Sequence, residues 1–160
     1  MKKKIWIIIL ISFLLTACGT SKQTADKRLV GTLDSTMGEQ TFSSTIKLEY
    51  NSEDETLIAG VFKYKYDNLE KTQTNNNILA DFINRQTMID QIDGVEVEAD
   101  VTDTSFDFEE KWNYNLVDID KALEADEEQK NFIENDKYSL KKIKEYYEKQ
   151  GYSFKEKDIK

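Results

Sequence analysis

The segment Leu15-Thr16-Ala17-Cys18 holds the residue of this chain whose chemistry is easiest to predict. Small side chains lead directly into the single cysteine of the sequence. A thiol in this position is suited to alkylation by a diacylglycerol, with cleavage of the chain before Cys18. We therefore predict a bacterial lipoprotein processing site, in which Leu15, Thr16 and Ala17 form the lipobox and Cys18 carries the lipid.

The residues before this site have the layout of a secretory signal. Three lysines follow Met1, and an apolar run from Ile5 to Leu15 is interrupted only by Ser12. A membrane-spanning helix needs about 20 apolar residues, so this run is too short to span. We expect residues 1–17 to be a lipoprotein signal peptide and the diacylglycerol on Cys18 to hold the protein on the outside of the cell membrane. The alternatives are an uncleaved membrane helix or a plain signal peptide.

Composition excludes several kinds of site. The chain has no histidine, so it has neither imidazole-based catalysis nor the usual zinc ligands. A formal net charge of −9 argues against a nucleic-acid partner. We expect no cofactor and no metal, and any ion that did bind would be a hard cation held by oxygen atoms.

Carboxylates cluster on one predicted strand. Glu96, Glu98 and Asp100 alternate with Val95, Val97 and Ala99, so they share a strand face, and Asp107 and Glu109 follow on the next predicted strand. Such a group resembles a set of calcium ligands, but a strand presents its side chains side by side rather than around a point. We predict a solvated acidic face without a specific metal site.

Four aromatic residues are candidates for contact with a partner: Tyr64, Tyr66, Trp112 and Tyr114. All four fall in predicted strands, where exposed rings can stack on a sugar or hold a partner strand. The competing interpretation, which the pattern favours, is burial between a sheet and its helices.

Alternation and helical spacing predict the elements. The predicted strands are residues 28–34, 41–50, 57–66, 95–101, 104–117 and 152–154, with a turn at residues 35–38. The predicted helices are residues 74–91, capped by Thr74 and ended by Gly94, a short acidic helix that starts at Asp118, and residues 140–149, capped by Ser139 and closed by Gly151.

This order favours an α+β fold. Hairpins dominate and strands do not alternate with helices, so we expect an antiparallel sheet of about five strands with helices packed on one face. Residues 18–27 are small and polar, and we expect them to be a flexible tether. Residues 28–160 are then a single domain.

The lipobox and several blocks of the chain resemble the YehR-like bacterial lipoproteins. The blocks are Gly94-Val95-Glu96 after the long helix, the run from Leu116 to Leu123, Tyr138-Ser139-Leu140, and Gln150-Gly151-Tyr152-Ser153-Phe154. The resemblance implies an α+β fold and a location at the cell surface. That family has no known function and supplies no catalytic residues.

The absence of a catalytic motif leads us to expect a binding or interaction module at the cell envelope that is not an enzyme, with an unidentified protein or cell-wall partner. One alternative is a carboxylate-dependent cell-wall hydrolase, since its two carboxylates could lie anywhere among the 31 acidic residues. The other is a solute-capturing accessory lipoprotein, which a single domain disfavours because such proteins close two lobes around a ligand.

Overall fold

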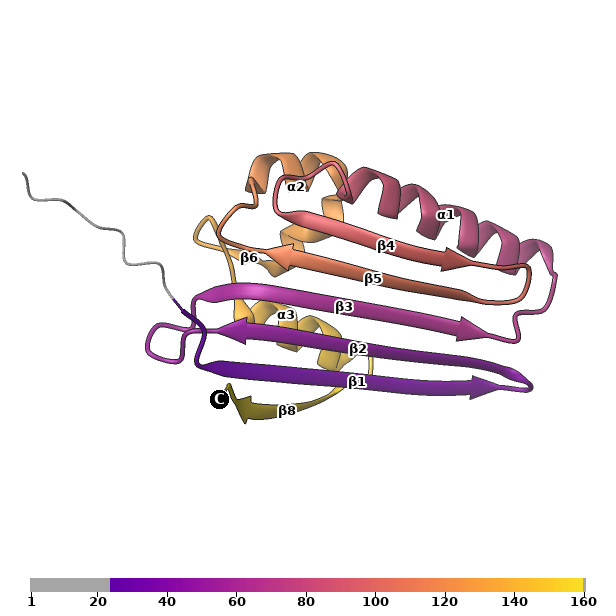
Figure 1. The fold of residues 1–160 in the computed structure, drawn as a ribbon, viewed down its shortest axis with the longest axis horizontal. Coiled ribbons are helices and arrows are strands. Elements are labelled where there is room, and N and C mark those ends of the chain that lie inside the picture. Colours follow the sequence, from indigo (N-terminus) through magenta and orange to yellow (C-terminus); the bar gives the residue numbers. More distant parts are fainter. Residues whose placement is uncertain (1–23, 160) are drawn as a thin grey trace, which may run out of the picture.

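The structure, a computed structural model, describes residues 24–159 (Figure 1). The predicted signal peptide, the lipobox and Cys18 lie outside these residues. The elements in chain order are β1 (Lys27–Met37), β2 (Gln40–Tyr50), β3 (Leu57–Asp67), α1 (Gln73–Ile89), β4 (Val95–Val101), β5 (Phe106–Asn113), α2 (Ile119–Ala125), the 3-10 helix η1 (Glu127–Phe132), β6 (Ile133–Glu134), β7 (Lys137–Tyr138), α3 (Leu140–Lys149) and β8 (Ser153–Asp158).

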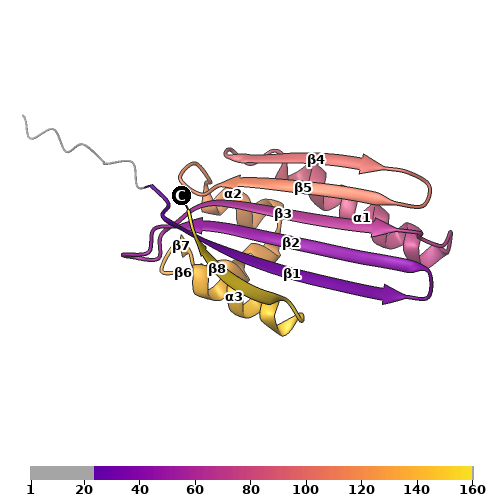
Figure 2. The same ribbon diagram turned by 60° about the horizontal axis from the view of Figure 1, so that its bottom comes forward.

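Within the described residues, one antiparallel sheet of six strands has the order β4-β5-β3-β2-β1-β8, and β6 and β7 form a separate small hairpin. The helices lie on one side of the large sheet (Figures 1 and 2). The predicted α+β class is therefore confirmed. The sheet has six strands where about five were expected, and the strand predicted at residues 152–154 corresponds to β8, which pairs with β1 and runs on to Asp158.

Strict alternation explains why the central strands form and which face they bury. On β2, Ser44, Ile46, Leu48 and Tyr50 are buried against the helices, while the residues between them face the opposite side. This is the period of two that the sequence shows. Since the helices cover only one face, the other face carries the polar side chains.

The predicted turn at residues 35–38 is wrong, because β1 continues to Met37. Met37 pairs with Gln40, so the loop is only Gly38-Glu39. Gly38 has φ +64°, which fits the two-residue hairpin turn with glycine at its first central position. The polar residues Ser35 and Thr36 resemble a turn in the sequence but belong to the strand.

The end of the predicted tether also belongs to the sheet. Lys27 is the first residue of β1 and pairs with Tyr50 and Asp158 in the strands on either side. The Asp26 carboxylate accepts hydrogen bonds from the backbone N–H (2.8 Å) and hydroxyl (2.6 Å) of Ser52. The folded part therefore starts before the expected residue 28.

The long helix differs from its prediction at both ends. Its cap is Thr72, whose hydroxyl accepts a hydrogen bond from the backbone N–H of Asn75 (3.1 Å), and not Thr74. The helix ends at Ile89, and a turn connects it to Gly94. The predicted cap Ser139 is confirmed, because its hydroxyl accepts a backbone N–H in the first turn of α3. The helix predicted to start at Asp118 is also present, and the Asp118 carboxylate caps it by accepting backbone N–H groups.

The predicted strand 104–117 is too long at both ends. Hydrogen bonds from Thr102 to Ser105 and from Leu116 to Asn113 close a turn at each end of β5. Leu116 is consequently 61% exposed rather than part of a buried strand face.

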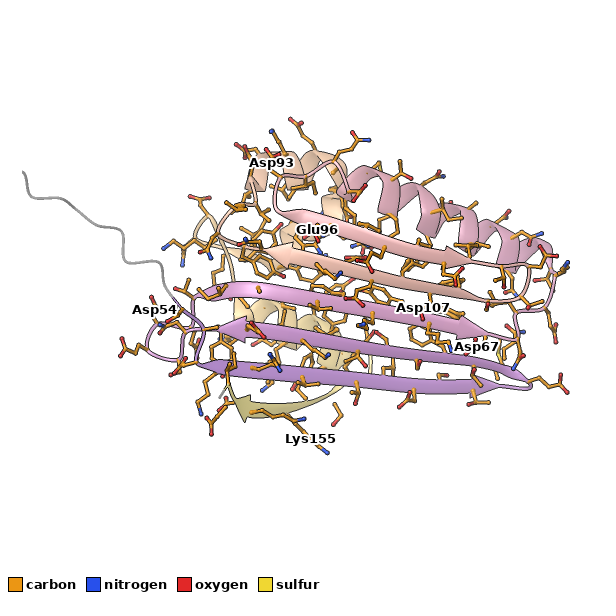
Figure 3. All side chains as sticks on the ribbon, in the orientation of Figure 1. Asp54, Asp67, Asp93, Glu96, Asp107 and Lys155 are labelled. Carbon is orange, nitrogen blue, oxygen red and sulfur yellow. The ribbon has the colours of Figure 1, made fainter. Side chains whose placement is uncertain are left out.

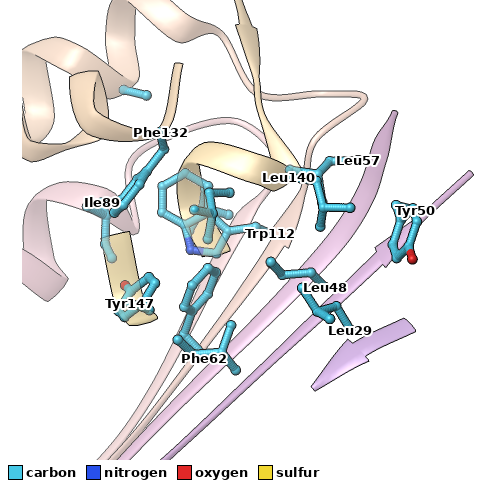
Figure 4. Close-up of a cluster of buried hydrophobic side chains, with 14 of the residues drawn as sticks. Leu29, Leu48, Tyr50, Leu57, Phe62, Ile89, Trp112, Phe132, Leu140 and Tyr147 are labelled. Atoms are coloured by element: carbon cyan, nitrogen blue, oxygen red, sulfur yellow. The ribbon is translucent and has the colours of Figure 1, made fainter. Parts of the chain in front are cut away.

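The core lies between the helices and the middle of the sheet (Figure 4). Its fully covered members include Ile46 and Leu48 from β2, Ile89 from α1 and Ile143 from α3. Burial of such a side chain stabilises a fold by about 1.5–3 kcal/mol. Within residues 24–159, no helix has the length and hydropathy needed to cross a membrane.

Candidate functional site

The structure separates the four aromatic residues that the sequence offers for partner contact. Trp112 is only 3% exposed, because the alternation of β5 points it into the core. Its indole N–H donates a hydrogen bond to the Glu110 carboxylate (3.2 Å). Trp112 therefore offers no surface to a partner.

Tyr114 is half-buried: it packs against the core and also lines a hollow at the end of the sheet where β3 begins. Its ring stacks on Trp112 with centroids 6.1 Å apart and lies 4.9 Å from the ring of Tyr138. Burial, and to a lesser extent Tyr138, raises the pKa of Tyr114 well above its ordinary value. Its role is to close the core at the end of β5.

Tyr64 and Tyr66 lie instead in a groove of about 430 Å³ between α1 and α3. The inner faces of β1, β2 and β3 form its floor. Its lining is dominated by aromatic side chains from strands and helices: Phe42, Tyr64, Tyr66, Phe82, Phe132, Tyr146, Tyr147 and Tyr152. The groove is the candidate functional site.

Helical spacing brings the walls of this groove together. On α1, Phe82 and Arg85 lie three residues apart, so they share one face. Tyr146 and Gln150, four residues apart, project from the end of α3 on the opposite wall. Figure 1 shows that α1 and α3 lie behind different parts of the sheet, and residues of both helices line the groove.

The rings of the floor hold one another in place. The centroids of Phe42 and Tyr66 are 4.4 Å apart, and Tyr66 lies 4.5 Å from the buried ring of Phe106. Phe82 contacts Phe106 (5.5 Å) and, edge to face, Tyr64 (5.4 Å). These are the separations at which aromatic pairs attract, so the rings stabilise one another's positions.

The tyrosines of the groove are neutral hydroxyl groups at ordinary pH. Burial is the main cause that raises the pKa of Tyr64, Tyr66, Tyr146, Tyr147 and Tyr152 above the usual 10. A neutral phenol can donate and accept a hydrogen bond. The groove therefore combines apolar ring faces with neutral polar groups.

Arg85 forms the charged end of the groove. Its Nη1 donates to Oε1 of Glu110 (2.6 Å), and its Nε donates to Oδ2 of Asp126 (3.0 Å). Burial alone would lower the pKa of Arg85, but the charges of Glu110 and Asp126 more than offset this and raise it. The guanidinium is thus neutralised by two carboxylates and holds α1 to β5 and η1.

The carboxylates at the groove do not form an available pair. Glu128 is the carboxylate that lines the groove, and the hydroxyl of Tyr146 contacts it at 3.5 Å. The next carboxylate, Asp126, is held by Arg85 and by the amide of Gln129 (3.0 Å). Glycoside hydrolysis usually needs a pair of available carboxylates, so the groove lacks the arrangement that the hydrolase alternative requires.

A second hollow, of about 640 Å³, lies at the end of the sheet where β3 begins. Loops and the β6–β7 hairpin form its walls, with Glu55, Glu134 and Asp136 among its lining residues. Within the described residues, no three carboxylates or other ligands are grouped so that they could hold a metal ion.

Lysines lie among the carboxylates of the acidic strand face, on which Figure 3 labels Glu96 and Asp107. Glu98 lies opposite Glu109 across β4 and β5, as the spacing predicts. Lys111 Nζ is 2.5 Å from the Glu98 carboxylate, and Lys63 pairs with Glu109. Lys63 and Lys111 thus offset part of the repulsion between carboxylates that the strand pairing brings together.

Residues 19–160 match the model of a domain of unknown function, DUF8824. The chain belongs to the DUF8824 family. Its fold is similar to the NMR structure of the protein from Streptococcus pneumoniae TIGR4, with 15% identity, 97% of this chain and 99% of that chain covered, and a TM-score of 0.52. At this identity the likeness shows the fold alone. No curated protein matches the chain. The YehR-like resemblance stays a prediction.

Sequence reasoning missed the ion pair of this DUF8824 domain. Glu110 occupies an inward position of β5, between Phe108 and Trp112, and is 1% exposed. A charged residue that interrupts an apolar alternation was the available signal. Its partner Arg85 lies one helical turn after Phe82, which places it on the same face of α1.

Proposed function

We propose that this DUF8824 protein is a lipid-anchored binding module on the outer side of the cell membrane, and that its aromatic groove holds the ligand. The observation that carries the proposal is the groove itself, in which eight aromatic side chains and a neutralised arginine line one space. Binding sites are typically apolar concavities with a few placed polar groups. The predicted lipobox supports the location.

A photo-crosslinker placed in the groove tests the binding function. Phe42 lies in the groove, and Ser43, the next residue of β2, faces the opposite side of the sheet. Replacing Phe42 by benzoylphenylalanine should give crosslinked products on irradiation of intact cells, whereas the same replacement of Ser43 should give none. Equal products from both positions, or none from position 42, would refute the groove as the binding site.

A cysteine substitution tests the anchor separately. In Cys18→Ala, we expect the protein to leave the membrane fraction or to accumulate as an uncleaved precursor, because the thiol is the predicted lipid acceptor. Lipid labelling and fractionation measure both effects. Normal processing and membrane retention of Cys18→Ala would contradict the anchor and leave the groove proposal standing.

A further inference from the structure

One half of the β1 edge has no neighbouring strand among the described residues. β8 pairs with residues 27–32 of β1, and β1 continues to Met37. Figures 1 and 2 show β8 lying along only part of β1, with the remainder forming the border of the sheet. Residues 33–37 are therefore paired on one side only, with β2.

The direction of the peptide groups follows from the hairpin. Met37 and Gln40 are the closing pair of a two-residue turn, so the peptide groups of Met37, Ser35 and Leu33 point toward β2. Those of Asp34 and Thr36, between them, point the other way. The open edge thus presents two backbone N–H and two C=O groups in the spacing that another strand would use.

The first part of the opposite edge of the sheet is protected. On β4, the Val97 N–H donates to the Asp90 carboxylate (3.1 Å), and the Val95 N–H donates to the Ile92 carbonyl (3.0 Å). The charged side chains of Glu96 and Glu98 also project from this strand. Proteins commonly block edge strands in such ways, so residues 33–37 of β1 differ from the first half of β4.

The aromatic groove begins at this open edge. Leu33 lines the groove, and Ser35 pairs with Phe42, which also lines it. A strand beside residues 33–37 would direct every second side chain toward this floor. Ser35 is small and exposed, which leaves space there for a larger side chain of the incoming strand.

Charge at the edge indicates what the other side chains of that strand should be. Asp34 faces the outer side of the sheet and makes no ion pair with any residue that the structure describes. A basic side chain opposite Asp34 would form a favourable cross-strand pair.

We propose that the ligand of the groove is an extended polypeptide segment that adds a strand to β1 at Asp34–Thr36. Its inward side chains are apolar and enter the aromatic groove, and its outward side chains are basic and lie opposite Asp34. The backbone hydrogen bonds supply affinity and the alternating pockets supply specificity, as in other strand-addition sites. The proposal rests on the proposed function and gives the chemical class of the ligand.

The probe is the capped peptide acetyl-Lys-Phe-Lys-Phe-Lys-amide, and its control is acetyl-Lys-Lys-Phe-Phe-Lys-amide, which has the same composition without the alternation. In a titration of the isotope-labelled protein, the alternating peptide should shift the amide signals of Asp34 and Thr36 and slow their hydrogen exchange. The control peptide should bind about tenfold more weakly, because it cannot combine backbone pairing with two inward rings.

Asp34→Pro removes one outward N–H and leaves the hydrogen bonds to β2 intact, since proline is tolerated at such edge positions. We expect it to weaken binding of the alternating peptide about tenfold. Asp34→Asn keeps the N–H, so its affinity for the same peptide should fall by less. A peptide with N-methyl groups on alternate residues tests the same bonds in the unchanged protein. It should fail to bind when the methylated edge faces β1.

Three results would overturn strand addition. The first is that Asp34→Pro binds the alternating peptide as tightly as Asp34→Asn does, and that the N-methylated peptide binds as tightly as the unmethylated one. The second is a set of shifts confined to groove rings such as Tyr66, which would leave the proposed function intact. The third is protection of Asp34 and Thr36 without peptide, together with dimerisation in sedimentation, which would assign the edge to a second copy. Loss of the Phe42 crosslinks instead refutes the proposed function.

Discussion

Glu110 is a carboxylate in the centre of an apolar core, and its surroundings compensate for its burial. Its Oε1 accepts hydrogen bonds from Arg85 Nη1 and Gln86 Nε2, both at 2.6 Å, and its Oε2 accepts one from Trp112 Nε1. A buried charge is tolerated only when it is paired and hydrogen-bonded in this way. The ion pair therefore fixes the position of α1 over β5 and supports the groove wall.

Removing this carboxylate should destabilise the domain severely. In Glu110→Met, the donors on Arg85, Gln86 and Trp112 lose their acceptor inside the core. We expect the free energy of unfolding to fall by about 3–5 kcal/mol, which is the cost of leaving one member of a buried ion pair without its partner. Urea denaturation followed by circular dichroism measures the loss.

Two variants make this measurement specific. Glu109→Gln, at the neighbouring outward position paired with Lys63, should cost less than about 1 kcal/mol. Arg85→Met combined with Glu110→Met should recover part of the loss, because neither charge is then buried alone. If the double variant loses as much unfolding free energy as the two single variants together, Arg85 and Glu110 are not coupled.

The last strand depends on a close approach at Gly31. Phe154 of β8 pairs with Gly31 of β1, and its ring lies across the glycine. A Cβ on residue 31 would lie 2.7 Å from Cζ of Phe154, closer than non-bonded atoms allow. The hydroxyl of Tyr50 also holds β8 by donating to Glu156 (2.7 Å).

Gly31→Ala should therefore displace Phe154 and loosen β8. We expect a loss of about 1–3 kcal/mol, typical of an overpacked site, with faster hydrogen exchange in β8. Thr32→Ala, an exposed neighbour, should change stability by less than about 0.5 kcal/mol. Phe154→Ala in the Gly31→Ala background should cost little more. If the losses of unfolding free energy from Gly31→Ala and Phe154→Ala were fully additive, the two residues would not share one contact.

Elements that depend on neighbouring residues could be predicted from the sequence, whereas those that depend on distant residues could not. Alternation predicts β2 and β5 because each buries one face along its whole length, and the caps Asp118 and Ser139 act on the next turn of chain. The position of β8 beside β1 depends on residues more than a hundred positions apart, which no local pattern encodes. The β6–β7 hairpin has two residues in each strand, too few for a period to show.

The candidate site is only partly predictable for the same reason. The sequence points to Tyr64 and Tyr66 through their strand, but the groove also requires Phe82 from α1 and Tyr146 from α3. Only the packing of these helices on the sheet brings them together. From the sequence, Trp112 could be either exposed for partner contact or buried. The pairing of β5 with β3 and β4 places it on the buried side of the strand.

At the scale of the whole molecule, the fold is a two-layer structure with one sheet face left to solvent. Acidic residues such as Glu96 and Asp107 lie on the β4–β5 half of this face, and Lys155 lies at the β8 edge (Figure 3). The helical face gathers the aromatic side chains. The aromatic groove therefore opens on the helical face of a chain whose net charge is acidic.

The eight tyrosines of the chain make the stability of this packing depend on pH. The pKa of every one of them is raised, chiefly by burial, and that of Tyr50 to about 12 with help from its bond to Glu156. In an unfolded chain they would ionise near the usual value of 10. The folded state therefore holds these protons more tightly than the unfolded state does.

The domain should consequently lose stability as the pH rises above about 10. The contribution of a group whose folded pKa is raised is complete below the unfolded pKa and disappears as the pH approaches the folded one. Raising the pKa of one tyrosine by one on folding stabilises the folded state by about 1.4 kcal/mol, so several buried tyrosines such as Tyr64 and Tyr147 make the effect large. Phenolate absorbance and circular dichroism should change together in one cooperative step between pH 10 and 12. A gradual phenolate titration near pH 10 with unchanged circular dichroism would show that the tyrosines are open to solvent and that the groove is not packed as described.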